Sequence, residues 1–452
     1  MKSNSIKSFS VYGLFGTYDV NIQFSENIKI LIGENGLGKT QILNLFYYTL
    51  TKDFFRLNEF NFERLEIKFS DKKTVEITKK SVAELVEEIY KHPLVKDIIE
   101  DIGFGQFEML RNKFAHNKRN WGKIEEQFIF SNSKLRNKYP IHRIFRVFEE
   151  LEMGKPRTSN RVLEKCKIDI DAEVGGVEIM YFPTFRRVEE DLYNLGYDEA
   201  ELQLNQENIL IQFGMDDVQK RFNKIENIID KLLKEGLSIF LKDVLKIVMS
   251  KNRVAIDNSI FERINENDLA IIFTRAKNLD NEIKEAVLQS VRTKQFNDPI
   301  SGLILQKLVE LYENQKELDG SVKIFRDVCN GYLINKKVFY DESAIKIYIK
   351  SDITGEEISL SKLSSGEKQI ISMFSKIYLS EPNKRFIVLF DEPELSLSMT
   401  WQKNLLPDII KSNKCDFLLA VTHSPFIFDN NLDPYAVGLN EYITLSKTVV
   451  LL

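Results

Sequence analysis

The sequence has little cysteine, few histidines and no long apolar run, and each shortage excludes a class of protein. Its three cysteines, Cys166, Cys329 and Cys415, lie far apart along the chain, so neither a disulfide framework nor a metal cluster is expected. The longest strongly apolar run, Phe386 to Phe390, falls far short of the roughly 20 residues that a transmembrane helix needs. The polar start of the chain also lacks the apolar segment of a signal peptide. We therefore expect a protein of the reducing cytoplasm.

A large excess of charge of either sign is lacking as well. The 63 lysines and arginines against 67 aspartates and glutamates give a net charge of −4. This balance argues against a broadly basic nucleic-acid coat, although it leaves room for a local basic groove. The 452 residues, 43% hydrophobic and 29% charged, are typical of a globular protein with two or three domains.

What the sequence does contain is a glycine-rich loop between an expected strand and an expected helix. Residues 30–32 form a short apolar run, residues 33–40 read GENGLGKT, and apolar residues then recur at helical spacing. In this context G-x-x-x-x-G-K-T indicates a P-loop. Its backbone N–H groups surround a phosphate at the start of a helix. We expect Lys39 to reach the β- and γ-phosphates and Thr40 to ligate Mg²⁺.

Alternating apolar and polar residues predict strands on both sides of this loop. Residues 7–24 are expected to form a hairpin, and residues 60–77 two further strands. A buried strand is expected near 177–182, returning from a helical segment to the same domain. Arg186 and Arg187 follow it, and they serve a phosphate, a partner or only an acidic surface.

The middle of the chain reads as helical and charged. Basic residues between 113 and 146 face either solvent or a polyanion. Two heptad runs, within 216–250 and within 304–329, pack either as an antiparallel helical arm or as an ordinary bundle. Gln315 lies in the second seam, where it is a candidate for setting the register.

A second informative region lies more than 300 residues after the loop. Residues 363–369 read LSSGEKQ and precede an apolar helix, and the apolar strand from Arg385 ends in Asp391 and Glu392. We expect Asp391 to hold the Mg²⁺ shell and Glu392 to position and deprotonate the attacking water. His423 follows a neighbouring apolar strand, and of the four histidines it is the one expected to contact the γ-phosphate.

The order of these motifs resembles the ABC class of ATPases, in its branch with SMC, RecF and OLD proteins. The resemblance implies an α/β fold: a P-loop ABC-type ATPase head, with a mixed sheet and an antiparallel β-edge, interrupted by a large mainly helical insert. Residues 1–80 and 335–452 would be the halves of the head, and 81–334 the insert. Ser365 stands where transporter ATPases have glycine, as is common in this branch, and Ser398 stands where many relatives have histidine. An ABC transporter ATPase is disfavoured by the size of the insert.

The resemblance further implies that two heads dimerise around two ATP molecules, with Mg²⁺. Ser364 and Gly366 of one subunit would contact the γ-phosphate held by the P-loop of the other. The candidate catalytic residues are Glu392, His423 and Lys39, and the candidate metal ligands are Thr40 and Asp391. The candidate nucleotide contacts are Gly33, Asn35, Gly36, Gly38, Lys39, Thr40, Gln41, Ser364, Gly366 and Glu367.

Within that branch, the length and layout resemble the stand-alone ATPase subunits of two-component anti-phage systems, of the PARIS type first and the Septu type second. After His423 the sequence leaves no room for a TOPRIM domain, so we expect this chain not to cut nucleic acid itself. A separate nuclease, of TOPRIM type or else HNH type, is the implied partner, and a phage protein the implied trigger. The alternative is an SMC- or RecF-like ATPase that binds DNA directly.

Overall fold

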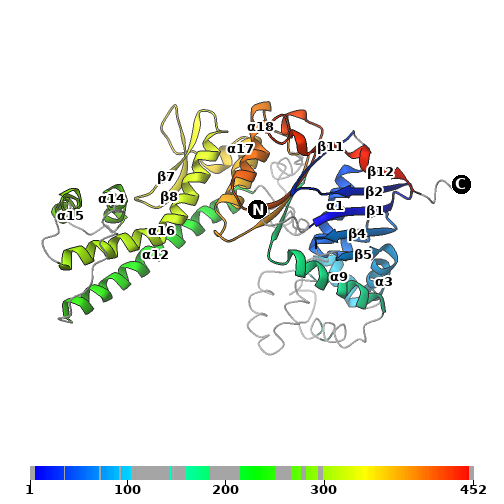
Figure 1. The fold of residues 1–452 in the computed structure, drawn as a ribbon, viewed down its shortest axis with the longest axis horizontal. Helices are drawn as coiled ribbons and strands as arrows, with labels where there is room; N and C mark the ends of the chain where they lie inside the picture. The colour runs from blue at the N-terminus through cyan, green and yellow to red at the C-terminus, as the bar shows by residue number, and fades with distance from the viewer. Residues whose placement is uncertain are drawn as a thin grey trace. The chain divides into compact units, whose positions relative to one another are not determined.

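The computed structural model describes residues 6–34, 36–70, 73–90, 93–102, 158–183, 214–249, 266–275, 281–293 and 299–446, together with residues 107, 143 and 146. The chain divides into two compact units (Figure 1). The first unit comprises Met1–Ile211 and Arg385–Leu452, and the second comprises Gln212–Lys384. None of the described helices is both long and apolar enough to cross a membrane.

The first unit contains an antiparallel sheet. Its strands are β1 (Ile6–Leu14), β2 (Tyr18–Gln23), β4 (Arg64–Phe69), β5 (Thr74–Thr78) and β12 (Ile443–Leu445), in the order β12-β2-β1-β4-β5. Phe9 of β1 lies opposite Ile22 of β2 and Ile67 of β4. The side chains of β4 alternate between buried and more exposed positions because one face of the sheet packs on the core. The hairpin over 7–24 and the two strands over 60–77 are thereby confirmed.

A parallel sheet in the same unit positions the functional residues. Its strands are β3 (Ile28–Ile32), β6 (Glu178–Phe182), β9 (Phe386–Asp391), β10 (Cys415–Thr422) and β11 (Ala436–Gly438), in the order β11-β3-β10-β9-β6. All six residues of β9 are buried, as expected for a strand covered on both faces. Because every pairing is parallel, β3, β9 and β10 end at one edge of the sheet, where α/β proteins bind ligands.

Helices cover these sheets and complete the core. The first unit contains α1 (Lys39–Thr51), α2 (Phe54–Leu57), α3 (Lys79–Tyr90), α4 (Pro93–Ile102), α9 (Thr158–Val174) and α18 (Met399–Lys411), with short 3-10 helices η2 (Pro425–Ile427), η3 (Asp433–Tyr435) and η4 (Leu439–Tyr442). Phe46 of α1 packs 4.9 Å from Phe9 and 6.0 Å from Phe417, measured between ring centroids. These rings connect α1 to both sheets in one apolar cluster, which fixes the helix that follows the P-loop.

The second unit is built on two long helices, α12 (Met215–Met249) and α16 (Pro299–Asn330), which lie side by side in Figure 1. Phe222, near the start of α12, packs 5.7 Å from Phe325, near the end of α16. Farther along, Asp243 pairs with Lys307 at 3.5 Å. The two helices are therefore antiparallel.

Further helices and a hairpin complete the second unit. They are α14 (Glu266–Arg275), α15 (Asn281–Thr293), β7 (Lys336–Asp341), β8 (Lys346–Ser351), η1 (Leu360–Lys362) and α17 (Ser365–Tyr378). Gln315 is fully buried, but its side chain accepts a 2.6 Å hydrogen bond from Arg275 of α14 and donates to Leu311 of its own helix. These two hydrogen bonds run to α14 and within α16, and a role of Gln315 in setting the register stays a prediction.

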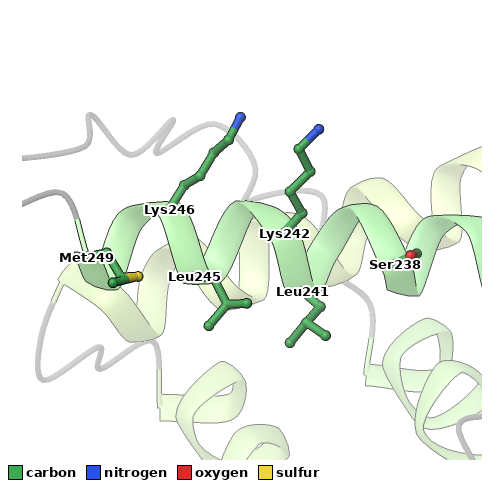
Figure 2. A pocket seen from close by; sticks show the side chains of 6 residues that line it. All are labelled: Ser238, Leu241, Lys242, Leu245, Lys246 and Met249. Atoms are coloured by element: carbon green, nitrogen blue, oxygen red, sulfur yellow. The ribbon is translucent and has the colours of Figure 1, made fainter.

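An apolar stripe at the end of α12 is exposed among the described residues (Figure 2). Leu241, Leu245 and Met249 expose 58%, 52% and 83% of their surface. Together with Ser238, Lys242 and Lys246 they line a groove of about 610 Å³. Within the described part of the chain, neither lysine has an ion pair. We call these six residues the α12 stripe.

The compact units differ from the domain boundaries expected from the sequence. Residues 335–384 were assigned to the second half of the head, yet they group with α12 and α16. The reason is packing: Phe374 of α17 lies 5.3 Å from Tyr332, which follows α16, and Arg221 of α12 donates to Ser375 of α17. The boundaries at 80 and 334 stay predictions about the functional halves.

Candidate nucleotide-binding site

The glycine-rich loop joins β3 to α1 in the first unit. Gly36 and Gly38 have φ angles of 90° and 76°, in the left-handed region that favours glycine. A Cβ atom at Gly38 would also lie only 2.8 Å from Cε2 of Phe15. Both glycines are therefore needed for the backbone path, as the motif predicts. Asn35 lies outside the described residues, and Gln41 is half-buried in the first turn of α1.

Lys39 reaches back over the loop from the first position of α1. Its Nζ atom donates to the carbonyl oxygens of Gly33 and Glu34, at 2.7 and 2.8 Å. It also lies 2.6 Å from Nε2 of His423. An ammonium group can only donate, so Nε2 of His423 is the acceptor in this contact. Burial lowers the pKa of Lys39, and the nearby carboxylates of Glu392 and Asp391 offset this only in part.

Two oxygen ligands meet beside Lys39 at the ends of different elements. The Oγ1 atom of Thr40 lies 3.1 Å from Oδ1 of Asp391, the last residue of β9. A hydroxyl and a carboxylate at this distance suit Mg²⁺, which prefers oxygen ligands and retains waters and substrate phosphates. The donor set therefore fits the expected ion, which Thr40 and Asp391 would hold.

Glu392 leaves the sheet in a strained conformation. Its φ is 51°, a left-handed value that is uncommon for a residue other than glycine, while its backbone N–H donates to Val421 of β10 at 2.9 Å. The carboxylate extends toward His423, with Oε1 3.6 Å from Nε2. Strained backbone of this kind persists where the surroundings hold it, and it often marks a functional position.

Glu394 is a functional candidate that the sequence analysis missed. Its carboxylate accepts three hydrogen bonds from the end of β10: from the Thr422 hydroxyl at 2.7 Å, from the His423 N–H at 2.8 Å and from the Ser424 N–H at 3.2 Å. The side chain thus holds the backbone that carries His423. The feature of the sequence that could have indicated this role is a third carboxylate, two residues after Glu392.

The same segment is tied to α18. The Ser424 hydroxyl donates to Gln402 at 2.6 Å, and the Gln402 amide nitrogen donates to the carbonyl oxygen of Leu397 at 2.9 Å. Ser398, which stands where many relatives have histidine, caps the start of α18 by accepting from the Trp401 N–H. The loop after β9 and the loop after β10 therefore form one hydrogen-bonded network.

The LSSGE segment forms the start of α17 in the second unit. Ser364 is the N-cap residue and is exposed, whereas Gly366 and Glu367 are buried in the first turn. The Ser364 side chain accepts from the Glu367 N–H at 3.4 Å, and the Glu367 carboxylate accepts from the Ser364 N–H at 2.8 Å. This is a capping box. The Ser364 hydroxyl accepts within it, so its own proton is left for a group outside the helix.

The predicted residues thus fall into two groups. Gly33, Lys39, Thr40, Asp391, Glu392 and His423 converge at one edge of the parallel sheet of the first unit. Ser364, Gly366 and Glu367 lie together in the second unit. Arg186, Arg187 and the basic residues between 113 and 142 lie outside the described residues.

A strand, a glycine loop and a helix, beside a buried strand that ends in two carboxylates, define a P-loop nucleoside triphosphatase. A family model described as an AAA ATPase domain, AAA_15, matches residues 6–428. The chain therefore belongs to this family of ATPases. The expected fold class, an α/β ATPase head with an antiparallel β-edge and a mainly helical insert, is confirmed.

The chain is similar in sequence to two curated bacterial proteins. The chain is 26% identical over 183 residues to the Retron Ec83 probable ATPase of Escherichia coli, covering 34% of this chain and 31% of the relative. It is 26% identical over 207 residues to the Retron Vc95 probable ATPase of Vibrio cholerae serotype O1 biovar El Tor, covering 39% of each. The matches span less than half of either relative.

Solved structures of Smc heads align along most of the chain. One is an Smc head domain with an extended coiled coil, bound to the C-terminal domain of ScpA, from Pyrococcus furiosus. It is 12% identical with a TM-score of 0.37, covering 99% of this chain and 98% of that chain. Another, an SmcHead bound to the C-winged helix domain of ScpA, is 10% identical with a TM-score of 0.34, covering 94% and 90%. Scores this low carry no argument.

Proposed function

We propose that this ATPase is the sensor and regulatory subunit of an anti-phage defence complex, in which ATP controls the assembly that holds a separate nuclease. One observation supports the proposal: Thr40 and Asp391 meet in one unit, whereas Ser364, the exposed N-cap residue of α17, lies in the other. Similarity to two ATPases of retrons, which are defence-associated, supports the biological setting.

The residues of the first unit suffice to bind and activate ATP in this proposal. Lys39 neutralises charge on the β- and γ-phosphates, and Glu392 accepts the proton of the attacking water. Thr40 and Asp391 hold Mg²⁺, which supplies positive charge to the phosphate oxygens. His423 hydrogen-bonds the γ-phosphate, and Glu394 keeps its backbone in place.

The second copy of the chain completes the site. The hydroxyl of its exposed Ser364 donates a hydrogen bond to the γ-phosphate bound at the first copy. Gly366 allows close approach at the start of α17. Two such contacts, related by a two-fold axis, form the dimer. ATP hydrolysis removes the shared phosphate, so the cycle is a change of assembly state.

The partner of the dimer is a separate nuclease, of TOPRIM type as in PARIS, with AriA as the analogous ATPase, or of HNH type as in Septu, with PtuA. The α12 stripe supports a protein partner, because exposed contiguous apolar side chains mark interaction sites. Lys242 and Lys246, which belong to that stripe, favour an acidic, apolar helix on the partner. In this proposal the separate nuclease is the subunit that cuts nucleic acid, and a phage protein releases it.

The ATP-dependent step is tested with Glu392→Gln, which keeps ATP bound because it removes the base. We expect light scattering to show a dimer with ATP and Mg²⁺, and a monomer without ATP or in Lys39→Ala. Association that ignores ATP would contradict the proposal.

The partner is tested with the nuclease encoded beside this protein. Leu245→Glu places a negative charge in the stripe and should abolish co-purification, with ATPase activity unchanged. Ile324→Glu on α16, equally exposed at 53%, is the matched control and should retain the partner. If no TOPRIM or HNH nuclease is encoded there, and turnover instead rises with DNA in a salt-sensitive way, the direct DNA-binding alternative holds.

A further inference from the structure

Lys336 is joined to the signature serine through Glu367. Its Nζ atom lies 3.0 and 2.8 Å from the two carboxylate oxygens of Glu367, so it contacts both. One of those oxygens also accepts from the Ser364 N–H. Glu367 is only 6% exposed, so its charge is held in a largely dry position and depends on these partners.

The strand that carries Lys336 is itself fixed to the end of α16. Asn330, the last residue of α16, exchanges two hydrogen bonds with the backbone of Val338, at 3.0 and 2.7 Å. Lys336 is two residues away on β7, paired with Ser351 of β8. The cation is therefore presented by a rigid hairpin and not by a loop.

The charge of Glu367 matters because of where it lies. The carboxylate is within hydrogen-bond distance of Ser364, whose hydroxyl contacts the γ-phosphate of the second copy in the proposed dimer. A bare carboxylate there would repel a polyanion in a poorly hydrated interface, where like charges are costly. Lys336 supplies the compensating positive charge. Its hydrogen bonds in the described part of the chain go to Glu367, not to Ser364.

We propose that Lys336 is a positioning residue of the composite ATP site: it neutralises Glu367 so that the start of α17 accepts a triphosphate. The inference rests on the proposed ATP-dependent dimer. It assigns to Lys336 an effect on association of two copies, and none on ATP binding by the P-loop of one copy.

The test measures the dimer dissociation constant with ATP and Mg²⁺ in full-length Glu392→Gln protein. Lys336→Met leaves Glu367 unpaired, and we expect dimerisation about tenfold weaker or more, the size of one uncompensated charge pair. Lys336→Arg keeps the charge and should restore it. Lys337→Met is the matched control, because Lys337 is the next residue on β7 and pairs with the exposed Asp352, away from Glu367.

The double variant Lys336→Met with Glu367→Gln separates the charge effect from simple loss of a bond. Glutamine also forms capping boxes, and without the carboxylate there is nothing to neutralise. We expect the double variant to dimerise more tightly than Lys336→Met alone. Binding of a fluorescent ATP analogue to the monomer and the thermal midpoint are measured on every variant.

Two outcomes would overturn the inference: Lys336→Met dimerising like the parent, or the double variant being as weak as Lys336→Met. In either case the Glu392→Gln parent still dimerises with ATP, and the proposed function stands. If the parent itself does not dimerise with ATP, the proposed function fails instead. If Lys336→Met fails to fold, its thermal midpoint will show this. The dimer dissociation constants of Lys336→Arg and Glu367→Gln are then compared, and both variants should dimerise.

Discussion

The two units handle charge in opposite ways. At the edge of the parallel sheet, Lys39 lies 2.6 Å from His423, Thr40 3.1 Å from Asp391 and His423 3.6 Å from Glu392, and Glu392 has a left-handed backbone. At the start of α17, the capping box and Lys336 satisfy Glu367 and leave one exposed hydroxyl, that of Ser364. The first arrangement concentrates reactive groups, and the second neutralises its charge.

This difference indicates how the work is divided. Charges gathered at the sheet edge are typical of a site that binds phosphate and activates water. A helix start whose carboxylate is neutralised and whose N-cap hydroxyl is exposed suits recognition of an anion that another molecule has already bound. Variants that act on one region and spare the other therefore test whether the division is real.

The largest effect is expected from Lys39→Ala. The amine is the positive charge placed for the phosphates, so both ATP binding and hydrolysis should be lost in calorimetric and phosphate-release assays. Lys52→Ala, at the other end of α1, is the control, because Lys52 pairs with Asp171 on the surface. Normal hydrolysis by Lys39→Ala would show that the site is wrongly assigned.

Glu394→Leu should reduce kcat without preventing ATP binding. A leucine side chain cannot accept the hydrogen bonds that the carboxylate receives from Thr422, His423 and Ser424, so His423 shifts. Misplacing a reacting group by an ångström costs up to about 100-fold, and we expect a loss of about 10- to 100-fold in kcat. Thr422→Val removes a single bond to Glu394 and should cost less. An unchanged kcat in Glu394→Leu would rule out a positioning role.

In the second unit, Arg275→Met should affect stability and not nucleotide binding. Arg275 is buried and bonds both oxygens of Asp319, at 3.0 and 2.8 Å, so its loss leaves an unpaired buried carboxylate. Such a change costs about 3–5 kcal/mol of unfolding free energy, measured by urea denaturation. Arg292→Met breaks the exposed pair with Glu266 and should cost much less. Equal losses in both variants would mean that burial of the pair does not matter.

The smallest effect is a pH dependence from Glu367. Burial acts to raise the pKa of Glu367, but hydrogen bonds from Lys336 and Ser364 together outweigh it and leave the pKa below the ordinary value of 4.5. The pair therefore contributes stability above pH 4.5, which is lost as the pH falls through the lower folded-state pKa. The difference in unfolding free energy between the parent and Glu367→Gln should shrink below pH 4.5. If this difference in unfolding free energy instead grew as the pH fell, the pKa of Glu367 would be raised in the folded state and not lowered.

Local patterns predicted the sheet edge well. The P-loop glycines, the buried strand before Asp391 and the apolar strand before His423 each follow from a few neighbouring residues. Contacts between residues far apart in the sequence could not be predicted, because they depend on tertiary packing. Glu394 accepts from the backbone of His423, and Lys336 contacts Glu367 only in the folded unit. Gln315 shows the same limit, since its partner Arg275 belongs to a helix that the heptad pattern does not include.

The central claim is that one ATP site uses both regions, from two copies of the chain. Lys39→Ala and Ser364→Arg should each be inactive alone, because the first lacks the phosphate-binding amine and the second blocks the signature contact. Because neither variant should dimerise with itself, the dimers in an equal mixture are mixed and have one intact composite site out of two, so ATPase activity should return to at most about half of the parent's. Activity that stays absent on mixing, while the two proteins still associate with ATP, would contradict the composite site.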